Sequence, residues 1–83
     1  MAVKQVIESD NFKRICNRLD NSFREQLNKV VLKIIENPEI GKPMRYNRKG
    51  TRELYVEPFR LSYYYSKDEN VLVFLDLYHK DEQ

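Results

Sequence analysis

Basic side chains gather in the middle of this 83-residue chain, where they could hold phosphate. Between residues 41 and 60 there are six basic residues against two acidic ones, so this segment has a net charge of +4. The last 23 residues carry a net charge of −3, so the overall charge of +2 is unevenly distributed. A local excess of cations indicates an anionic partner, whereas a uniform excess would indicate only solubility or loose association.

Arg60 is the basic residue whose position the sequence predicts most directly. Side chains of a strand point alternately to its two faces, and the segment 59–66 divides accordingly. One face receives Phe59, Leu61, Tyr63 and Tyr65, and the other receives Arg60, Ser62, Tyr64 and Ser66. If the apolar set packs beneath helices, the Arg60 guanidinium stands on the uncovered face, where it could hold phosphate. The alternative is an ion pair across the sheet with Glu53, Glu57 or Asp76.

The single histidine lies near the end of the chain, directly before Lys80. An unperturbed histidine has a pKa near neutrality, so His79 is the natural candidate for a general acid or base. The alternative interpretation is an exposed C-terminal residue with no chemical role.

Two helices are expected to position these residues. The apolar residues of the first recur at helical spacing at Phe12, Ile15, Cys16 and Leu19. This helix is predicted to begin after an N-cap at Ser9 or Asp10 and to end near Asp20. The second is predicted to begin at Ser22, which opens a capping box, and to stop at residues 37–38, an Asn-Pro pair. The short connection between them predicts an antiparallel helical hairpin.

Strands are expected on either side of the helices. Residues 2–7 alternate loosely and predict a first strand, while 53–57, 59–66 and 71–78 predict three antiparallel strands. The order β-α-α-β-β-β predicts an α+β fold, a small antiparallel sheet with the helical hairpin packed on one face. The other face is then left for function, and residues 38–51 form a basic loop beside it.

The composition limits the classes of protein that fit. The length predicts one domain, residues 1–83, with no room for a cofactor domain. One cysteine and one histidine far apart argue against structural zinc and against an intramolecular disulfide. Cys16 is interpreted as a small buried hydrophobe, the alternative being a reactive thiol. Since no signal peptide or membrane span is expected, the compartment is predicted to be the cytoplasm.

The motifs together resemble the RelE/ParE superfamily of bacterial and archaeal toxins. The matching pieces are Phe12-Lys13-Arg14 with Leu19, Asn37-Pro38-Glu39-Ile40-Gly41, Phe59-Arg60-Leu61-Ser62-Tyr63-Tyr64-Tyr65, and Val71-Leu72-Val73-Phe74 running into Tyr78-His79-Lys80. Their order covers nearly the whole chain. The resemblance implies a compact toxin neutralised by a small antitoxin. In the RelE branch it implies an endoribonuclease that cleaves mRNA on the ribosome without a metal or cofactor.

The resemblance also implies roles for individual residues. In that chemistry a ribose 2′-hydroxyl attacks the adjacent phosphate, which requires a base, cations for the extra charge and an acid for the leaving oxygen. Arg60 occupies the place of the family's central arginine and is expected to stabilise the charge. Lys80 or His79 falls at the C-terminal functional position, and Arg52 matches a basic position used for phosphate or as a base.

Further residues are expected to bind RNA. The basic residues of the loop would contact its backbone, and two tyrosines would stack on bases. These residues are Lys42, Arg45, Arg48, Lys49, Tyr64 and Tyr78. The alternatives are a solvated loop and ordinary sheet aromatics. Two other functions stay open, a ParE-like inhibitor of DNA gyrase and a non-catalytic toxin or regulator acting through its antitoxin complex. They are favoured by Leu54, where RelE-like enzymes commonly carry a second basic residue, and by the chain's end, which has no aromatic after the basic motif.

Overall fold

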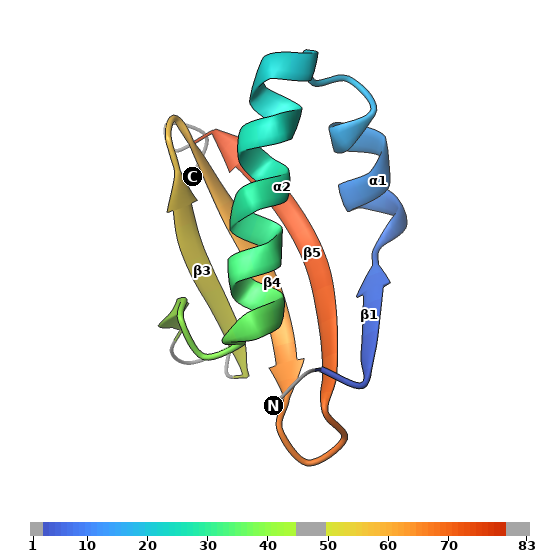
Figure 1. Cartoon of the computed structure of the whole chain (residues 1–83), viewed down its shortest axis with the longest axis vertical. Coiled ribbons are helices and arrows are strands. Elements are labelled where there is room, and N and C mark those ends of the chain that lie inside the picture. Colours follow the sequence, from blue (N-terminus) through green and yellow to red (C-terminus); the bar gives the residue numbers. More distant parts are fainter. Residues whose placement is uncertain (1–2, 45–49, 80–83) are drawn as a thin grey trace.

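The computed structural model of the chain describes residues 3–44 and 50–79. Within them the elements are β1 (Gln5–Glu8), α1 (Asp10–Cys16), α2 (Asn21–Glu36), β2 (Lys42–Pro43), β3 (Thr51–Val56), β4 (Phe59–Ser66) and β5 (Val71–His79). The strands form one sheet in the order β1-β5-β4-β3-β2. Helix α2 runs along one face of this sheet, and α1 packs beside β5 beyond the end of β1 (Figure 1). The predicted α+β fold is confirmed.

The sheet differs from the prediction in two respects. It was expected to be wholly antiparallel, but β1 pairs parallel to β5, because the chain passes through both helices and three strands before β5 returns beside β1. The loop after α2 contains a strand that the sequence did not predict, since β2 has only two residues and one of them is proline. Strands β1 and β2 thus flank the three central antiparallel strands, β3, β4 and β5, that the sequence predicted.

The helix boundaries depend on hydrogen bonds at the helix ends. Ser9 caps α1 as predicted, because its Oγ accepts from the backbone N–H of Phe12 at 3.0 Å. The helix then ends at Cys16 and not near Asp20, since after the C-cap Asn17 the N–H groups of Arg18 and Leu19 donate three residues back instead of four. The predicted N-cap at Ser22 is wrong. Asp20 caps α2 instead, where its carboxylate accepts from the backbone N–H of Phe23 at 2.8 Å.

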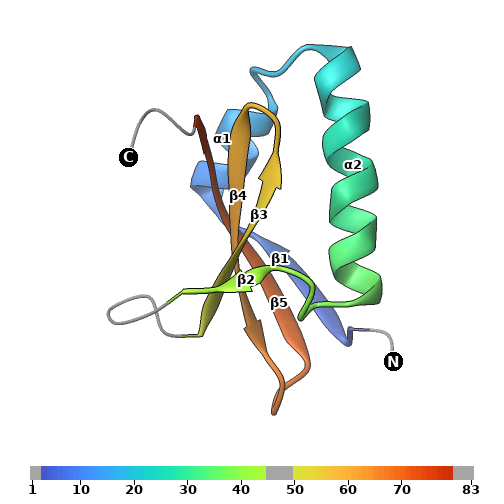
Figure 2. The same cartoon turned by 90° about the vertical axis from the view of Figure 1, so that its left-hand side faces the viewer.

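The core lies between α2 and the sheet. Its buried apolar residues are Phe12, Leu27, Ile34, Val56, Leu61, Tyr63, Leu72, Phe74 and Leu77. Phe12 of α1 stacks on Phe74 of β5 with ring centroids 5.4 Å apart, which fixes α1 against the sheet. In Figure 2, α2 stands on one side of the sheet only. We call this side the covered face and the opposite side the open face.

Candidate functional site on the open face

Strand β4 places Arg60 as the alternation predicted. Leu61 and Tyr63 are fully buried under α2, so Arg60, Ser62 and Tyr64 face the other way. The Arg60 side chain is 41% exposed, and its Nη1 lies 3.7 Å from Glu53 Oε1 on β3. Both expectations for Arg60 therefore hold at once. It stands on the open face, and it also forms an ion pair across the sheet.

Glu53 is the acidic centre of the open face. It is 7% exposed, and its Oε2 accepts a hydrogen bond from the Tyr78 hydroxyl of β5. Lys42 is its register partner on β2. The sequence analysis considered Glu53 only as a possible partner of Arg60. Alternation along β3 could have placed it on the open face, but the register that brings it beside Tyr78 arises from the tertiary structure.

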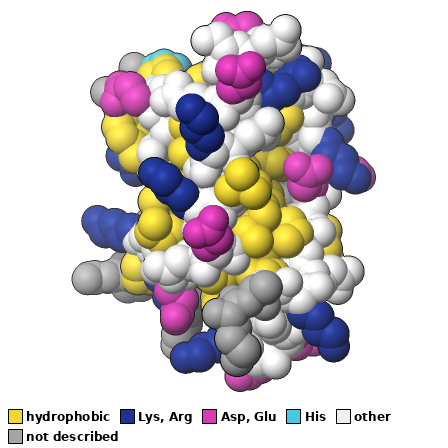
Figure 3. Space-filling model, viewed as in Figure 1, with side chains coloured by type: hydrophobic (Ala, Val, Ile, Leu, Met, Phe, Trp, Pro, Cys, Tyr) yellow, Lys and Arg dark blue, Asp and Glu magenta, His cyan; other side chains and the backbone are white. Residues whose placement is uncertain are grey.

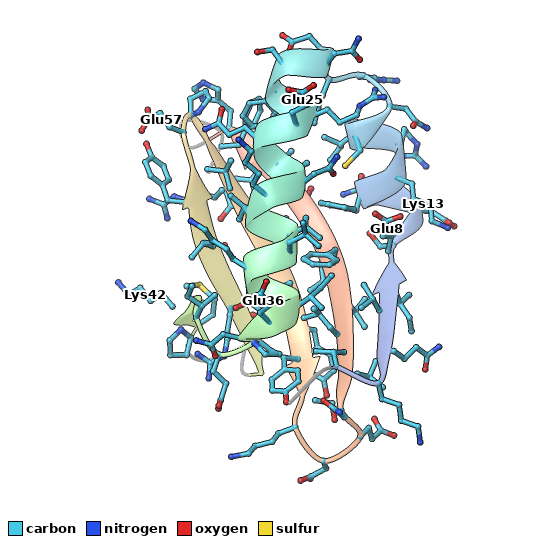
Figure 4. All side chains as sticks on the ribbon, in the orientation of Figure 1. Glu8, Lys13, Glu25, Glu36, Lys42 and Glu57 are labelled. Carbon is cyan, nitrogen blue, oxygen red and sulfur yellow. The ribbon has the colours of Figure 1, made fainter. Side chains whose placement is uncertain are left out.

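A groove of about 510 Å³ runs along the edge of β3 beside these residues. It is lined by Ile40, Lys42, Met44, Glu53, Leu54, Tyr55 and Arg60. Lys42 and Pro43 of β2 pair with Glu53 and Arg52 of this edge, and the Met44 N–H donates to the Thr51 carbonyl at 3.0 Å. In Figure 4 the Lys42 side chain extends outward from this edge. The groove thus combines two cations and one carboxylate with an apolar floor.

Tyr64 and Tyr78 both lie on the open face, as expected. Tyr78 is the register partner of Arg60, while Tyr64 is 38% exposed and lies further along β4. Tyr55, opposite Arg60 on β3, is 48% exposed and was not anticipated as a site residue. An exposed phenol on the same face as Arg60 offers a plane on which a base can stack.

The side chain of Arg52 does not lie on the same face of the sheet as that of Arg60. It pairs with Tyr63 in the register, so its side chain lies on the covered face. Its Nη1 donates to the carbonyl oxygens of Glu39 at 3.1 Å and Gly41 at 2.8 Å, and its Nη2 lies 3.8 Å from the Glu39 carboxylate. The guanidinium therefore holds the loop between α2 and β2.

Tyr63 holds the same loop from within the core. Its hydroxyl donates to the Pro38 carbonyl at 2.8 Å and accepts from the Gly41 N–H at 2.9 Å. Burial raises the pKa of this phenol, against smaller lowering effects of the Gly41 hydrogen bond and of Arg52. A Cβ on Gly41 would lie 2.6 Å from the Tyr63 oxygen, so glycine is needed for this close approach. We call Tyr63, Arg52 and the loop that they hold the loop clasp.

His79 is turned away from the Arg60 side chain. It is the register partner of Phe59, and the two rings meet edge to face at 5.6 Å on the covered face. Phe59 also packs against Phe23 of α2. The other predicted site residues, Lys80, Arg45, Arg48 and Lys49, lie outside the described residues.

A second cavity, of about 320 Å³, lies where α1, α2 and the end of β1 meet. Arg24 of α2 reaches into this region and donates to the carbonyl of Cys16 at the end of α1 and to that of Leu19 in the turn that follows. Burial and the nearby Glu8 carboxylate raise the pKa of Cys16, while Arg24 opposes them. Figure 4 shows Glu8 and Lys13 side by side at this cavity. Cys16 is half-buried and packs against the core, which fits its interpretation as a small hydrophobe.

Within residues 3–44 and 50–79, no group of three His, Cys, Asp or Glu side chains comes together to hold a metal ion. In the same ranges, no helix is both long enough and apolar enough to cross a membrane.

Solved structures define the class of fold. The chain resembles the M. tuberculosis RelBE2 toxin-antitoxin complex, with a TM-score of 0.83, 20% identity, and coverage of 96% of this chain and 100% of that one. It resembles the isolated E. coli RelE toxin with a TM-score of 0.78 at 17% identity over 94% and 85% of the two chains. It also resembles a YoeB/ParE toxin from Agrobacterium tumefaciens, with a TM-score of 0.78 at 14% identity over 90% of this chain and 96% of that one. The fold is that of the RelE-like toxins.

The sequence itself identifies the family. Residues 9–83 match the family model described as the ParE toxin of type II toxin-antitoxin systems, parDE. No curated protein matches the chain significantly. The chain therefore belongs to the ParE toxin family of the RelE/ParE superfamily, as its motifs indicated.

Proposed function

We propose that this toxin is a ribosome-dependent endoribonuclease of the cytoplasm, which inhibits translation by cutting mRNA. The observation that carries the proposal is Arg60, a partly exposed guanidinium on a central strand of the open face. Lys42 lies on the same face at the edge of the sheet, and the exposed Tyr55 is the register partner of Arg60 on β3. Cations beside aromatic planes are the combination that binds single-stranded RNA.

The chemistry assigned to the open face follows from its residues. Attack of the ribose 2′-hydroxyl on the adjacent phosphate gives a 2′,3′-cyclic phosphate and frees the 5′-hydroxyl. Arg60 would stabilise the charge that develops on the phosphate oxygens. We assign proton transfer to Lys80, the residue that follows β5 in the sequence, because His79 faces the covered side and packs against Phe59. Arg52 would act indirectly, by holding the loop that leads into Lys42.

A small antitoxin is the proposed protein partner. The M. tuberculosis RelBE2 structure is described as a toxin-antitoxin complex, and this chain shares its fold. Hydrophobic side chains gather beside α2 on the covered side of the molecule (Figure 3). Leu32 of α2 is 58% exposed and Val6 of β1 is 42% exposed. Exposed apolar area of this kind supports a binding surface for another chain.

Primer extension on mRNA from a translating extract tests the proposal. Wild-type protein is expected to produce cuts at ribosomal A sites, and Arg60→Ala is expected to abolish them because the phosphate charge is no longer stabilised. Arg14→Ala is the matched control, since Arg14 is an exposed arginine of α1. Absence of cuts with the wild type, or equal cutting by Arg60→Ala, would contradict the proposal.

The second candidate function is inhibition of DNA gyrase by binding. It is favoured by the Arg60–Glu53 ion pair, which compensates the central cation, and by the placement of Arg52 and His79 on the covered face. A supercoiling assay with purified gyrase separates the two candidates. Inhibition of supercoiling together with intact mRNA would select this second function.

A further inference from the structure

A carboxylate lies in the middle of the face that is proposed to bind RNA. Glu53 has Lys42 as its register partner on one side and Arg60 within 3.7 Å on the other. An anionic group at this position is unexpected, because it repels phosphate. A role is therefore needed for Glu53 that the proposed chemistry does not supply.

The contacts of Glu53 fix its charge in place. The side chain is 7% exposed, so it cannot turn freely into solvent. Its two oxygens face different strands, one toward Arg60 of β4 and the other toward the Tyr78 hydroxyl of β5. The hydrogen bond with Tyr78 needs an acceptor but no charge, and a neutral glutamine would supply one. The charge of Glu53 is engaged by Arg60, the residue that is proposed to hold phosphate.

A phosphate held by Arg60 would feel that charge. A hydrogen-bonded oxygen lies about 2.9 Å from the guanidinium, and the Glu53 carboxylate lies 3.7 Å from the same group. Both distances are well inside the screening length of about 8 Å at physiological salt. The carboxylate and the phosphate therefore compete for one guanidinium and repel each other.

We propose that Glu53 is a specificity-determining residue, which lowers the affinity of the open face for free single-stranded RNA. RNA that is held by additional contacts, as on a ribosome, overcomes the competition, whereas free RNA with few contacts does not. The inference rests on the proposed function. It explains how a toxin with an exposed arginine avoids binding every RNA that it meets.

The test measures binding without cleavage. A fluorescent 2′-O-methyl oligouridylate cannot be cut by 2′-hydroxyl attack, so its anisotropy reports the affinity of the full chain alone. Glu53→Gln is expected to bind about fivefold tighter, with a salt slope steeper by about 0.7 for the one phosphate gained. The control Glu57→Gln makes the same charge change at the turn between β3 and β4 (Figure 4), and it is expected to change affinity by less than about twofold.

A second pair of variants adds charge, so that the test does not depend on how Glu53→Gln folds. Ser62 is the register partner of Glu53 on β4, and Ser66 lies further along the same strand. Ser62→Glu is expected to weaken binding about fivefold, and Ser66→Glu by less than about twofold. Thermal melts verify that each variant is folded.

The outcomes are separable from those of the cleavage assay. Equal affinities of Glu53→Gln and Glu57→Gln would overturn the inference, as would equal effects of Ser62→Glu and Ser66→Glu. So would a failure of Glu53→Gln to bind the oligonucleotide at low salt. A wild type that cuts no mRNA would contradict the proposed function, whereas the affinities test the effect of Glu53 on RNA binding independently of cleavage.

Discussion

The loop clasp makes the stability of the fold depend on one hydroxyl group. Tyr63→Phe removes that hydroxyl and leaves the ring in the core, so the apolar packing of the side chain is kept. The Pro38 carbonyl and the Gly41 N–H then each lose a buried partner. We expect the variant to be strongly destabilised and to release the loop that leads into β2.

The magnitude follows from the two groups left without a partner. Each buried polar group that loses its hydrogen bond costs about 1–3 kcal/mol, so the sum is about 2–6 kcal/mol. A chain of this length has a free energy of unfolding of about 4–12 kcal/mol. Because about 1 kcal/mol shifts the melting temperature of such a domain by roughly 4–8 °C, a fall of at least about 8 °C is expected.

Urea unfolding followed by circular dichroism measures the loss in free energy of unfolding. The midpoint should fall while the slope stays constant, since the surface exposed on unfolding hardly changes. Tyr64→Phe is the matched control. It removes the same hydroxyl from the next residue of β4, where the side chain is 38% exposed, and should change stability by less than about 0.5 kcal/mol.

Gly41→Ala tests the clasp from its other side. Its Cβ would lie 2.6 Å from the Tyr63 oxygen and 3.0 Å from the Glu53 carbonyl oxygen, so the loop must move away. Since both substitutions break the same contact, the double variant should be destabilised by less than the sum of the two single effects. Equal stability of Tyr63→Phe and Tyr64→Phe, or full additivity of the Tyr63→Phe and Gly41→Ala effects, would refute the reasoning.

Two further predictions concern titratable groups. The raised pKa of Tyr63 favours the neutral phenol in the folded state, so its contribution to stability is present below its ordinary pKa of 10.0 and is lost as the pH rises through the raised value. Unfolding titrations above pH 10 should show a steeper loss of stability for the wild type than for Tyr63→Phe, and parallel curves would contradict this. The pKa of Cys16 is raised above 9.0 by burial and by Glu8. Iodoacetamide at about pH 8 should label the folded thiol far more slowly than the urea-unfolded chain, and Glu8→Gln should speed the labelling because it removes a charge that disfavours the thiolate.

The sequence by itself determined the local features of this protein. Alternation placed Arg60 opposite Leu61 and Tyr63, because a strand with one buried face allows only one orientation of its side chains. Helical spacing located both helices, and the predicted strands 59–66 and 71–78 lie where β4 and β5 are found. These features depend on neighbours in sequence, so they could be predicted without the fold.

The helix ends were predicted less well. Ser22 and Asp20 are both good capping residues, and only the backbone geometry at Asp20 decides between them. The β2 strand was missed, because two residues give no periodicity and its pairing with β3 depends on the loop clasp.

Only the tertiary structure decided the composition of the site. Arg52, Arg60 and His79 are all plausible from their types, but the registers of β3 and β5 turn Arg52 and His79 to the covered face. The same registers bring Glu53 and Tyr78, twenty-five positions apart in sequence, into one hydrogen bond on the open face. A shift of one residue exchanges the two faces of a strand, so strand register determines which charges meet. That register is set by long-range pairing, which no local pattern in the sequence contains.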